Sequence, residues 1–150
     1  LERDMMACIN CTELIQILLN LAVNAFQSTT QPQTVEISAR RHDDPIDVAA
    51  LERSGLAVTV NDASFSNRQP LVAITVADQG KGIEESVVAR IFEPYFTTKN
   101  DGSGTGLGLP IVRNIVRSHG GDICAENHHE GAVFIVELPV SARVSLIDVD

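Results

Sequence analysis

Glycines alternate with other residues directly ahead of a stretch that predicts a helix. Residues 99–109 read Lys-Asn-Asp-Gly-Ser-Gly-Thr-Gly-Leu-Gly-Leu, so every second position from 102 to 108 is glycine. Glycine reaches positive φ without a steric penalty, which lets bare backbone N–H groups close around an anion. The helix predicted over 109–119 carries Pro110 in its first turn, and its N-terminus adds free N–H groups and a favourable dipole. The arrangement predicts a phosphate site, and the ligand we expect is a nucleotide.

The spacing of these glycines excludes two familiar nucleotide loops. A P-loop ends in Gly-Lys-Ser/Thr, and that tripeptide occurs nowhere in the chain. The dinucleotide fingerprint Gly-x-Gly-x-x-Gly needs a third glycine, but each Gly-x-Gly pair here is followed at that position by Leu109, Leu107 or Ile111. The run also lies late in the chain rather than early in a βαβ unit.

A second glycine pair follows a predicted strand. Residues 71–77 are rich in β-branched side chains and predict a buried strand, after which comes Asp78-Gln79-Gly80-Lys81-Gly82. A carboxylate at a strand end can accept a hydrogen bond from a flat heterocycle, because the glycines let the ring approach the backbone. The same residues also fit an ordinary turn. A near-copy at 58–62 ends in Asp62 without glycines and is the weaker candidate.

A helix predicted over residues 11–28 begins with a capping box, Asn10-Cys11-Thr12-Glu13. Its expected apolar face, at helical spacing, consists of Ile15, Leu18, Leu19, Ala22, Val23 and Phe26. Ile17 and Leu21 add apolar bulk on another side.

The same helix carries a narrow stripe of neutral amides. The stripe consists of Gln16, Asn20, Asn24 and Gln27, spaced three or four residues apart. Buried amides are costly without partners, so such a stripe predicts a ligand or a network. Side-chain carbonyl oxygens suit Mg²⁺, which is held by few protein groups together with nucleotide phosphates.

Four segments in this order resemble the ATP-binding catalytic domain of sensor histidine kinases. That family is grouped with gyrase, heat-shock chaperones of the ninety-kilodalton class and mismatch-repair ATPases. The segments are Asn20–Ala25 (N box), Asp78–Gly82 (first glycine box), Phe92–Lys99 (F box) and Gly104–Leu109 (second glycine box). His119-Gly120-Gly121 and Gly131–Phe134 also fit, so the resemblance covers about residues 9–140.

The resemblance implies ATP and Mg²⁺ as cofactors and assigns roles by position. Asn24 would coordinate Mg²⁺, Asp78 would bind the adenine amino group, and Asn20 and Lys99 would join Asn24 in catalysis. The nucleotide site would further include Gly80, Gly82, Ile83, Phe92, Thr98, Gly104, Thr105, Gly106, Leu107, Gly108 and Leu109. Asn20 replaces a glutamate that activates water in gyrase-like relatives; an amide cannot act as a general base. This favours phosphoryl transfer to a protein over hydrolysis.

The chain departs from the family pattern at several positions. Gln27 replaces a frequent Lys or Arg, so one phosphate contact is expected to be lost, and Ala132 replaces a frequent Thr near adenine. Gln79 replaces the usual Asn without an expected effect. The connection over residues 42–70 looks longer than usual, and within it we expect a short helix near 46–53 and a strand near 56–60.

None of the four histidines lies in the phosphoacceptor context of this family. The candidates are His42, His119, His128 and His129, and His119 is better explained as a cation at a helix C-terminus. The expected partners are therefore a dimerisation and histidine-phosphoacceptor domain of the same protein and a response regulator receiver domain. Two alternatives stay open: a protein-serine kinase of the anti-sigma-factor type, and a regulatory module that binds nucleotide without catalysis.

Composition bounds the function further. The 150 residues carry a net charge of −9, which disfavours nucleic-acid binding, and no apolar run approaches the length of a membrane span. Without a signal peptide and with Leu1 in first place, we expect a fragment from the cytoplasm whose parent could be membrane-anchored. Cys8 and Cys11 form a lone Cys-x-x-Cys, for which helix-flanking filler is a better account than redox or zinc chemistry.

The predicted fold is an α+β, two-layer α/β sandwich of the Bergerat type. We expect a catalytic domain over 1–141 and a tail over 142–150. Helices are predicted over 11–28, 84–91 and 109–119, and strands over 34–40, 56–60, 71–77, 122–126 and 132–138. A mixed, mostly antiparallel sheet would be covered on one face by the helices, with ATP under a glycine-rich lid at 93–107.

Overall fold

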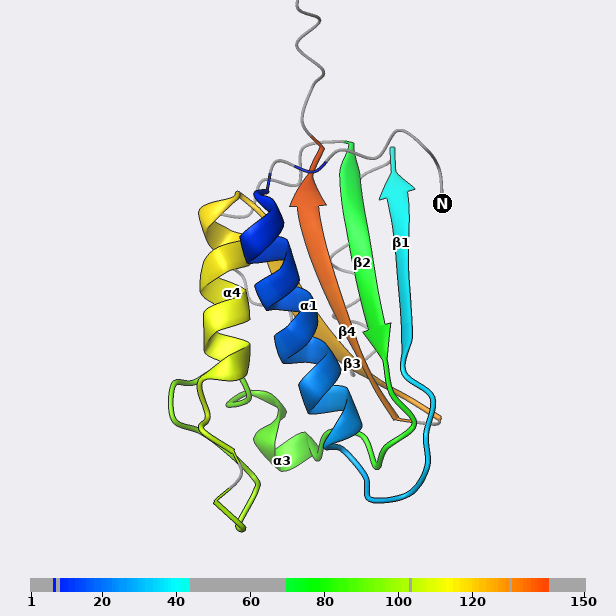
Figure 1. Ribbon diagram of the computed structural model, residues 1–150, viewed down its shortest axis with the longest axis vertical. Coiled ribbons are helices and arrows are strands. Elements are labelled where there is room, and N and C mark those ends of the chain that lie inside the picture. Colours follow the sequence, from blue (N-terminus) through cyan, green and yellow to red (C-terminus); the bar gives the residue numbers. More distant parts are fainter. Residues whose placement is uncertain (1–6, 8, 44–69, 103, 130, 141–150) are drawn as a thin grey trace, which may run out of the picture.

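The computed structural model describes residues 7, 9–43, 70–102, 104–129 and 131–140. The elements, in order, are α1 (Cys11–Phe26), β1 (Glu36–His42), β2 (Leu71–Ala77), α3 (Glu85–Val88), α4 (Gly108–Ser118), β3 (Asp122–His128) and β4 (Gly131–Pro139). Helices α1 and α4 lie side by side over one face of the sheet, which confirms the α+β sandwich (Figure 1). The helix expected near 46–53 and the strand near 56–60 fall outside the described residues, as does the tail over 142–150.

The four described strands form one sheet in the order β1-β2-β4-β3. Each of the three pairings is antiparallel, so the parallel pairing that a mixed sheet implies is not among the described strands. Strand β4 returns from the β3 edge through a tight hairpin and inserts beside β2. This insertion brings the end of β2 next to the start of β4, where the candidate site lies.

The face of α1 that packs against the sheet is not the one that the sequence predicts. The structure buries Ile17, Leu21 and Ala25. Four members of the expected core face are 49 to 61 % exposed: Ile15, Leu19, Val23 and Phe26. Helix α1 has two apolar faces, and the buried one borders the amide stripe, so packing of this face brings the amides to the edge of the core.

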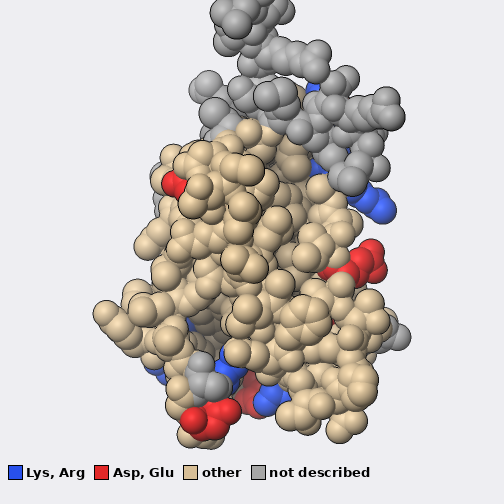
Figure 2. Space-filling view, viewed as in Figure 1, with Lys and Arg blue, Asp and Glu red and all other residues tan. Residues whose placement is uncertain are grey.

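The outward apolar stripe of α1 lies in a surface with few charges. Glu13 is the only charged residue in α1, and the middle of the face that Figure 2 shows carries no charged side chain.

At the start of the helix, the predicted capping box is confirmed, because Asn10 Oδ1 accepts a 2.9 Å hydrogen bond from the Glu13 backbone N–H. The Glu13 carboxylate lies 2.6 Å from His119 Nε2, which ties α1 to the C-terminal end of α4.

Two carboxylates lie opposite each other on β3 and β4, at the end of the sheet away from the β3–β4 hairpin. Asp122 pairs with Glu137 in the strand register, and each residue is at most 9 % exposed. Burial, followed by the negative charges of Asp122 and Glu126, raises the pKa of Glu137 to about 7. The pKa of Asp122 is also raised, chiefly by burial, although Arg117 at 3.5 Å opposes the shift.

The two described thiols differ in their surroundings. Cys11 is exposed at the start of α1, Cys124 is buried on β3, and Cys8 lies outside the described residues. Burial and three nearby carboxylates raise the pKa of Cys124 to about 12, which keeps it protonated.

No helix among the described residues is both long and apolar enough to traverse a bilayer.

Candidate nucleotide site

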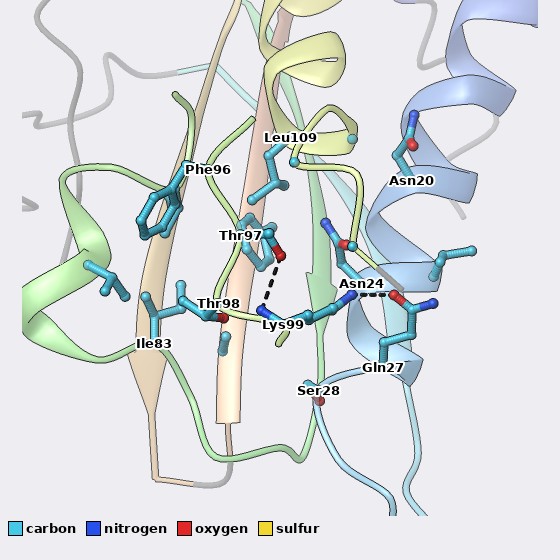
Figure 3. Close-up of a pocket in the computed structure, with 18 of the residues that line it drawn as sticks. Asn20, Asn24, Gln27, Ser28, Ile83, Phe96, Thr97, Thr98, Lys99 and Leu109 are labelled. Carbon is cyan, nitrogen blue, oxygen red and sulfur yellow. Dashed lines mark hydrogen bonds between the residues drawn. The ribbon is translucent and has the colours of Figure 1, made fainter. Parts of the chain in front are cut away.

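A cavity of about 530 Å³ opens between α1, the end of β2 and the glycine-rich segment before α4 (Figure 3). This volume is in the usual range for small-molecule sites. The described lining combines the amide stripe, the strand-end carboxylate and the glycine run: Asn20, Val23, Asn24, Gln27, Ser28, Asp78, Lys81, Gly82, Ile83, Glu84, Val87, Ile91, Phe96, Thr97, Thr98, Lys99, Gly104, Thr105, Gly106, Gly108, Leu109, Pro110, Ala132 and Phe134. Residues from both ends of the sequence therefore share one cavity.

Most of the residues expected at the site line this cavity, and three do not. Asn20, Asn24, Asp78, Gly82, Ile83, Thr98, Lys99, Gly104, Thr105, Gly106, Gly108 and Leu109 are in the lining, whereas Gly80, Phe92 and Leu107 are not. Gly80 packs against Ser28 instead, where an added Cβ would lie 2.2 Å from the hydroxyl oxygen. Phe92 is buried in the core, and Leu107 is the N-cap of α4.

The carboxylate at the end of β2 is fixed by the backbone around it. Asp78 Oδ1 accepts hydrogen bonds from the Gly80 N–H at 2.8 Å and the Ala132 N–H at 3.2 Å. The Asp78 side chain is almost buried, at 8 % exposure. Its other oxygen, Oδ2, has no hydrogen-bond partner among the described residues, so it is free to accept a hydrogen bond from a ligand.

The sequence interpretation missed Asn127 on β3. Its Oδ1 accepts from the Ile83 N–H at 2.7 Å, and its Nδ2 donates to the Ile83 carbonyl at 2.6 Å. Gly82 is wedged beside this contact, with φ at +74° and room for no Cβ, because one would lie 2.8 Å from Asn127 Oδ1. Nothing in the sequence pairs residues 44 positions apart, so no local signal points to this contact.

A second pair of amides, also missed, holds the segment after α1 against the first glycine box. Gln33 Oε1 accepts from the Gln79 N–H at 3.1 Å, and Gln79 Oε1 accepts from the Thr34 N–H at 3.0 Å. Gln79, where the family has Asn, therefore has a structural contact of its own. Together with Asn127, these amides fix the backbone that follows Asp78, at Gln79 and Ile83.

The segment expected to form the lid is held together at its base by a backbone contact. The Tyr95 N–H donates to the Gly106 carbonyl at 2.8 Å. Gly106 has φ at +66°, and an added Cβ would lie 2.5 Å from the Tyr95 carbonyl carbon, so only glycine fits. Tyr95 is itself the only described non-glycine residue with positive φ, at 66°. Such a backbone conformation is costly and occurs mainly where a fold requires it.

Lys99 extends from the lid toward α1. Its ammonium donates a hydrogen bond to Gln27 Oε1, and its backbone N–H donates to Thr97 Oγ1 at 3.1 Å (Figure 3). Gln27 is the C-cap of α1, so this contact joins the lid to the end of the helix.

Asn20 and Asn24 of α1 both line this cavity, near the start of α4. Asn20 Nδ2 donates to the Gln16 carbonyl at 3.0 Å, one turn earlier in the helix. The Asn20 oxygen lies 3.3 Å from where a Cβ on Gly108 would be, at the start of α4. Among the described residues no group of three or more His, Cys, Asp or Glu side chains could hold a metal ion. A divalent cation here would depend on amide oxygens and on the phosphates of a ligand.

Fold and cavity define a class: an α+β sandwich with a nucleotide-sized cavity between the helix layer and a glycine-rich loop. A family described as histidine kinase-, DNA gyrase B-, and HSP90-like ATPase matches residues 10–142. The chain belongs to this family.

Individual relatives narrow the class to sensor histidine kinases. The chain is 40 % identical over 131 residues to sensor histidine kinase ZraS of Salmonella typhimurium, which covers 87 % of this chain and 22 % of ZraS. It is 32 % identical over 139 residues to the sensory histidine kinase/phosphatase NtrB of Rhizobium leguminosarum bv. phaseoli, covering 93 % of this chain and 33 % of NtrB. The chain thus spans between a fifth and a third of the length of these relatives.

Solved structures agree with this assignment. The catalytic domain of histidine kinase ThkA superposes with a TM-score of 0.63 at 32 % identity, covering 88 % of this chain and 69 % of that one. Full-length ShkA in complex with AMPPNP gives a TM-score of 0.59 at 29 % identity, covering 87 % of this chain and 22 % of ShkA. The chain corresponds to the catalytic domain of these kinases.

Proposed function

We propose that this chain binds ATP with Mg²⁺ and transfers the γ-phosphoryl group to a histidine on a separate dimerisation and phosphoacceptor domain of the same protein. A response regulator receiver domain would then take the phosphoryl group. The observation that carries the proposal is that Asn24, Asp78 and Lys99 line one cavity, although they come from three distant segments. Similarity to sensor histidine kinases supports it.

Each end of the cavity has a separate task in this proposal. Asp78 Oδ2 accepts a hydrogen bond from the adenine amino group, and Ile83 and Phe134 pack against the ring. At the other end, Lys99 and the N–H groups of the lid bind the phosphates. Asn24 supplies an amide oxygen to Mg²⁺, which neutralises charge on the phosphates when bound.

The chain's own residues position the reactants and neutralise charge. The γ-phosphorus forms a bond to the lone pair of an imidazole nitrogen, and the bond to the β-phosphate oxygen breaks, so that ADP leaves with that electron pair. Asn20 is an amide and cannot deprotonate water, which favours transfer over hydrolysis. None of the four histidines is among the described residues that line the cavity, which supports an acceptor on another domain.

The proposed function implies a cytoplasmic domain that makes no direct membrane contact. It is compatible with a membrane-anchored parent protein. A net charge of −9 also argues against a nucleic-acid partner.

Two measurements test the proposed function. Titration calorimetry of the chain with ATP should give binding that depends on Mg²⁺ and is lost in Asn24→Ala. With the acceptor domain of the parent protein added, γ-labelled ATP should yield an acid-labile, alkali-stable phosphohistidine. Robust hydrolysis without an acceptor that survives Asn24→Ala would contradict the proposal. Tight, metal-independent binding without transfer would favour the regulatory module instead.

A further inference from the structure

We propose that Gln27 is a positioning residue, whose side-chain oxygen holds the Lys99 ammonium at the phosphate end of the cavity. This inference rests on the proposed function, because it assigns the ammonium to nucleotide phosphates. It also revises the expectation that glutamine at this position only removes a phosphate contact.

Both residues are anchored through their backbones, and their side chains meet in the cavity lining. The Gln27 N–H donates to the Val23 carbonyl at 3.0 Å, which fixes Gln27 at the end of α1. The Lys99 N–H donates to Thr97 Oγ1 at 3.1 Å. The Lys99 ammonium and Gln27 Oε1 then bond across 72 positions of sequence, as Figure 3 shows. The contact therefore sets where the end of a long, flexible side chain lies.

The chemistry of the pair fits positioning. An ammonium has three N–H donors, so a single bond to Gln27 leaves two for a phosphate. A neutral amide also leaves the positive charge of Lys99 undiminished, whereas a carboxylate in its place would neutralise the charge. Fixing a lysine side chain costs conformational entropy, and a contact that fixes it before the ligand arrives improves affinity.

Of the lysines in the described lining, Lys99 is the one that we assign to the phosphates. The described lining contains two lysines, and Lys81 belongs to the first glycine box next to Asp78, at the purine end. Lys99 precedes the glycine run, at the end where phosphates would bind. A second cation at position 27 would repel Lys99; the glutamine orients it instead.

The test compares ATP with adenosine, a probe that lacks the phosphates. In calorimetry on the 150-residue chain, Gln27→Ala should weaken Mg²⁺–ATP binding by about three- to tenfold and leave adenosine binding unchanged. In a Lys99→Ala background, Gln27→Ala should cause no further loss, because its effect passes through Lys99. Gln31→Ala, an exposed glutamine in the loop after α1, is the matched control and should bind both probes normally.

A second variant separates position from charge. Gln27→Glu retains an acceptor for Lys99 but cancels its charge, so ATP binding should fall further than in Gln27→Ala. Equal losses for ATP and adenosine, or additive losses in the double variant, would overturn the inference. Absence of ATP binding by the unaltered chain would contradict the proposed function itself.

Discussion

The two ends of the cavity are built differently. At the end proposed for the purine (the purine end), Asp78 is 8 % exposed, its Oδ1 is bonded to two backbone N–H groups, and Asn127 fixes the nearby Ile83. At the end proposed for the phosphates (the phosphate end), the contacts come from a loop whose residues 100–102 are exposed. Sheet hydrogen bonds fix the first end, and a few loop contacts fix the second.

The difference assigns a different role to each end. A ligand binds more tightly to groups that hydrogen bonds already hold in place, because binding then orders no further part of the protein. A loop with few contacts orders when its ligand arrives, which suits a lid. We therefore expect purine recognition to be independent of the lid, and phosphate binding to depend on it. The four changes below test this division, ordered by their expected effect on nucleotide affinity.

The largest effect is expected for Asp78→Asn. The amide that replaces the carboxylate puts an N–H₂ group where two N–H donors already point, or removes the acceptor for the purine. ATP and adenosine should both bind at least about 100-fold more weakly by calorimetry, because buried polar groups lose their partners. Asp43→Asn, on an exposed aspartate paired with Arg41, is the control and should bind normally. If Asp78→Asn binds adenosine within twofold of the unaltered chain, Asp78 does not recognise the purine and the assignment of this end is wrong.

Gly106→Ala should act on the phosphate end alone. The new methyl would lie 2.5 Å from the Tyr95 carbonyl carbon and would force the base of the lid open. ATP affinity should fall about tenfold or more, while adenosine affinity stays unchanged.

Gly102→Ala is the matched control for this change. Gly102 also has positive φ, at +75°, but an added Cβ meets nothing within 4 Å. Its effect on ATP affinity should stay below about threefold, since only backbone strain remains. Similar losses in both variants would show that strain, not the contact with Tyr95, is responsible.

Asn127→Ala tests the support of the purine end. Removal of the amide leaves the N–H and carbonyl of Ile83 without their partner, so the free energy of unfolding should fall by about 1–3 kcal/mol. ATP and adenosine should lose affinity equally, by about three- to tenfold. Denaturant unfolding and calorimetry measure the two effects. Asn114→Ala, on the exposed side of α4, controls for loss of an amide; a loss confined to ATP would contradict the assignment.

Glu137→Gln should change stability without changing nucleotide affinity. In the folded chain the pKa of Glu137 is about 7, above the ordinary 4.5, so the folded state binds the proton more tightly than the unfolded state. Stability that is present below pH 4.5 is therefore lost as the pH rises through about 7.

Thermal unfolding at pH 5 and pH 8 measures this change. The variant should lose the part of the pH dependence that Glu137 causes and gain about 2 kcal/mol at pH 8 relative to the unaltered chain. An altered adenosine affinity would mean that this end of the sheet and the purine end are coupled. An unchanged pH dependence would mean that another carboxylate causes it.

Local patterns predicted the elements well where a single pattern was decisive. The stretch over 71–77, rich in β-branched side chains, forms strand β2 with the predicted bounds. Helix α1 shows the opposite case. It carries two apolar faces, and the structure buries the face with Ile17 and Leu21 and leaves the face with the larger set of side chains exposed. Hydrophobic spacing identifies a helix but does not choose between two such faces.

The lining of the cavity was predictable, and its supports were not. Asn24, Asp78 and Lys99 stand in segments whose order along the chain resembles a known family. Asn127 and Gln33 act through partners 44 to 46 residues away, and amides in strands and loops carry no local signature of such contacts. The sequence placed Gln27 in the amide stripe and marked it as a departure from the family, but its bond to Lys99 exists only in three dimensions.

Asp78 forms both a backbone and a side-chain hydrogen bond with Ala132, next to the β2–β4 pairing. The Asp78 backbone N–H donates to the Ala132 carbonyl at 3.0 Å, and the Ala132 N–H donates to the Asp78 side chain at 3.2 Å. The β2–β4 register places these residues side by side. Insertion or deletion of one residue in either strand would exchange inward and outward side chains and also separate this pair. The length of these two strands is thereby tied to the position of the Asp78 carboxylate, and length variation among homologues should be found in other segments.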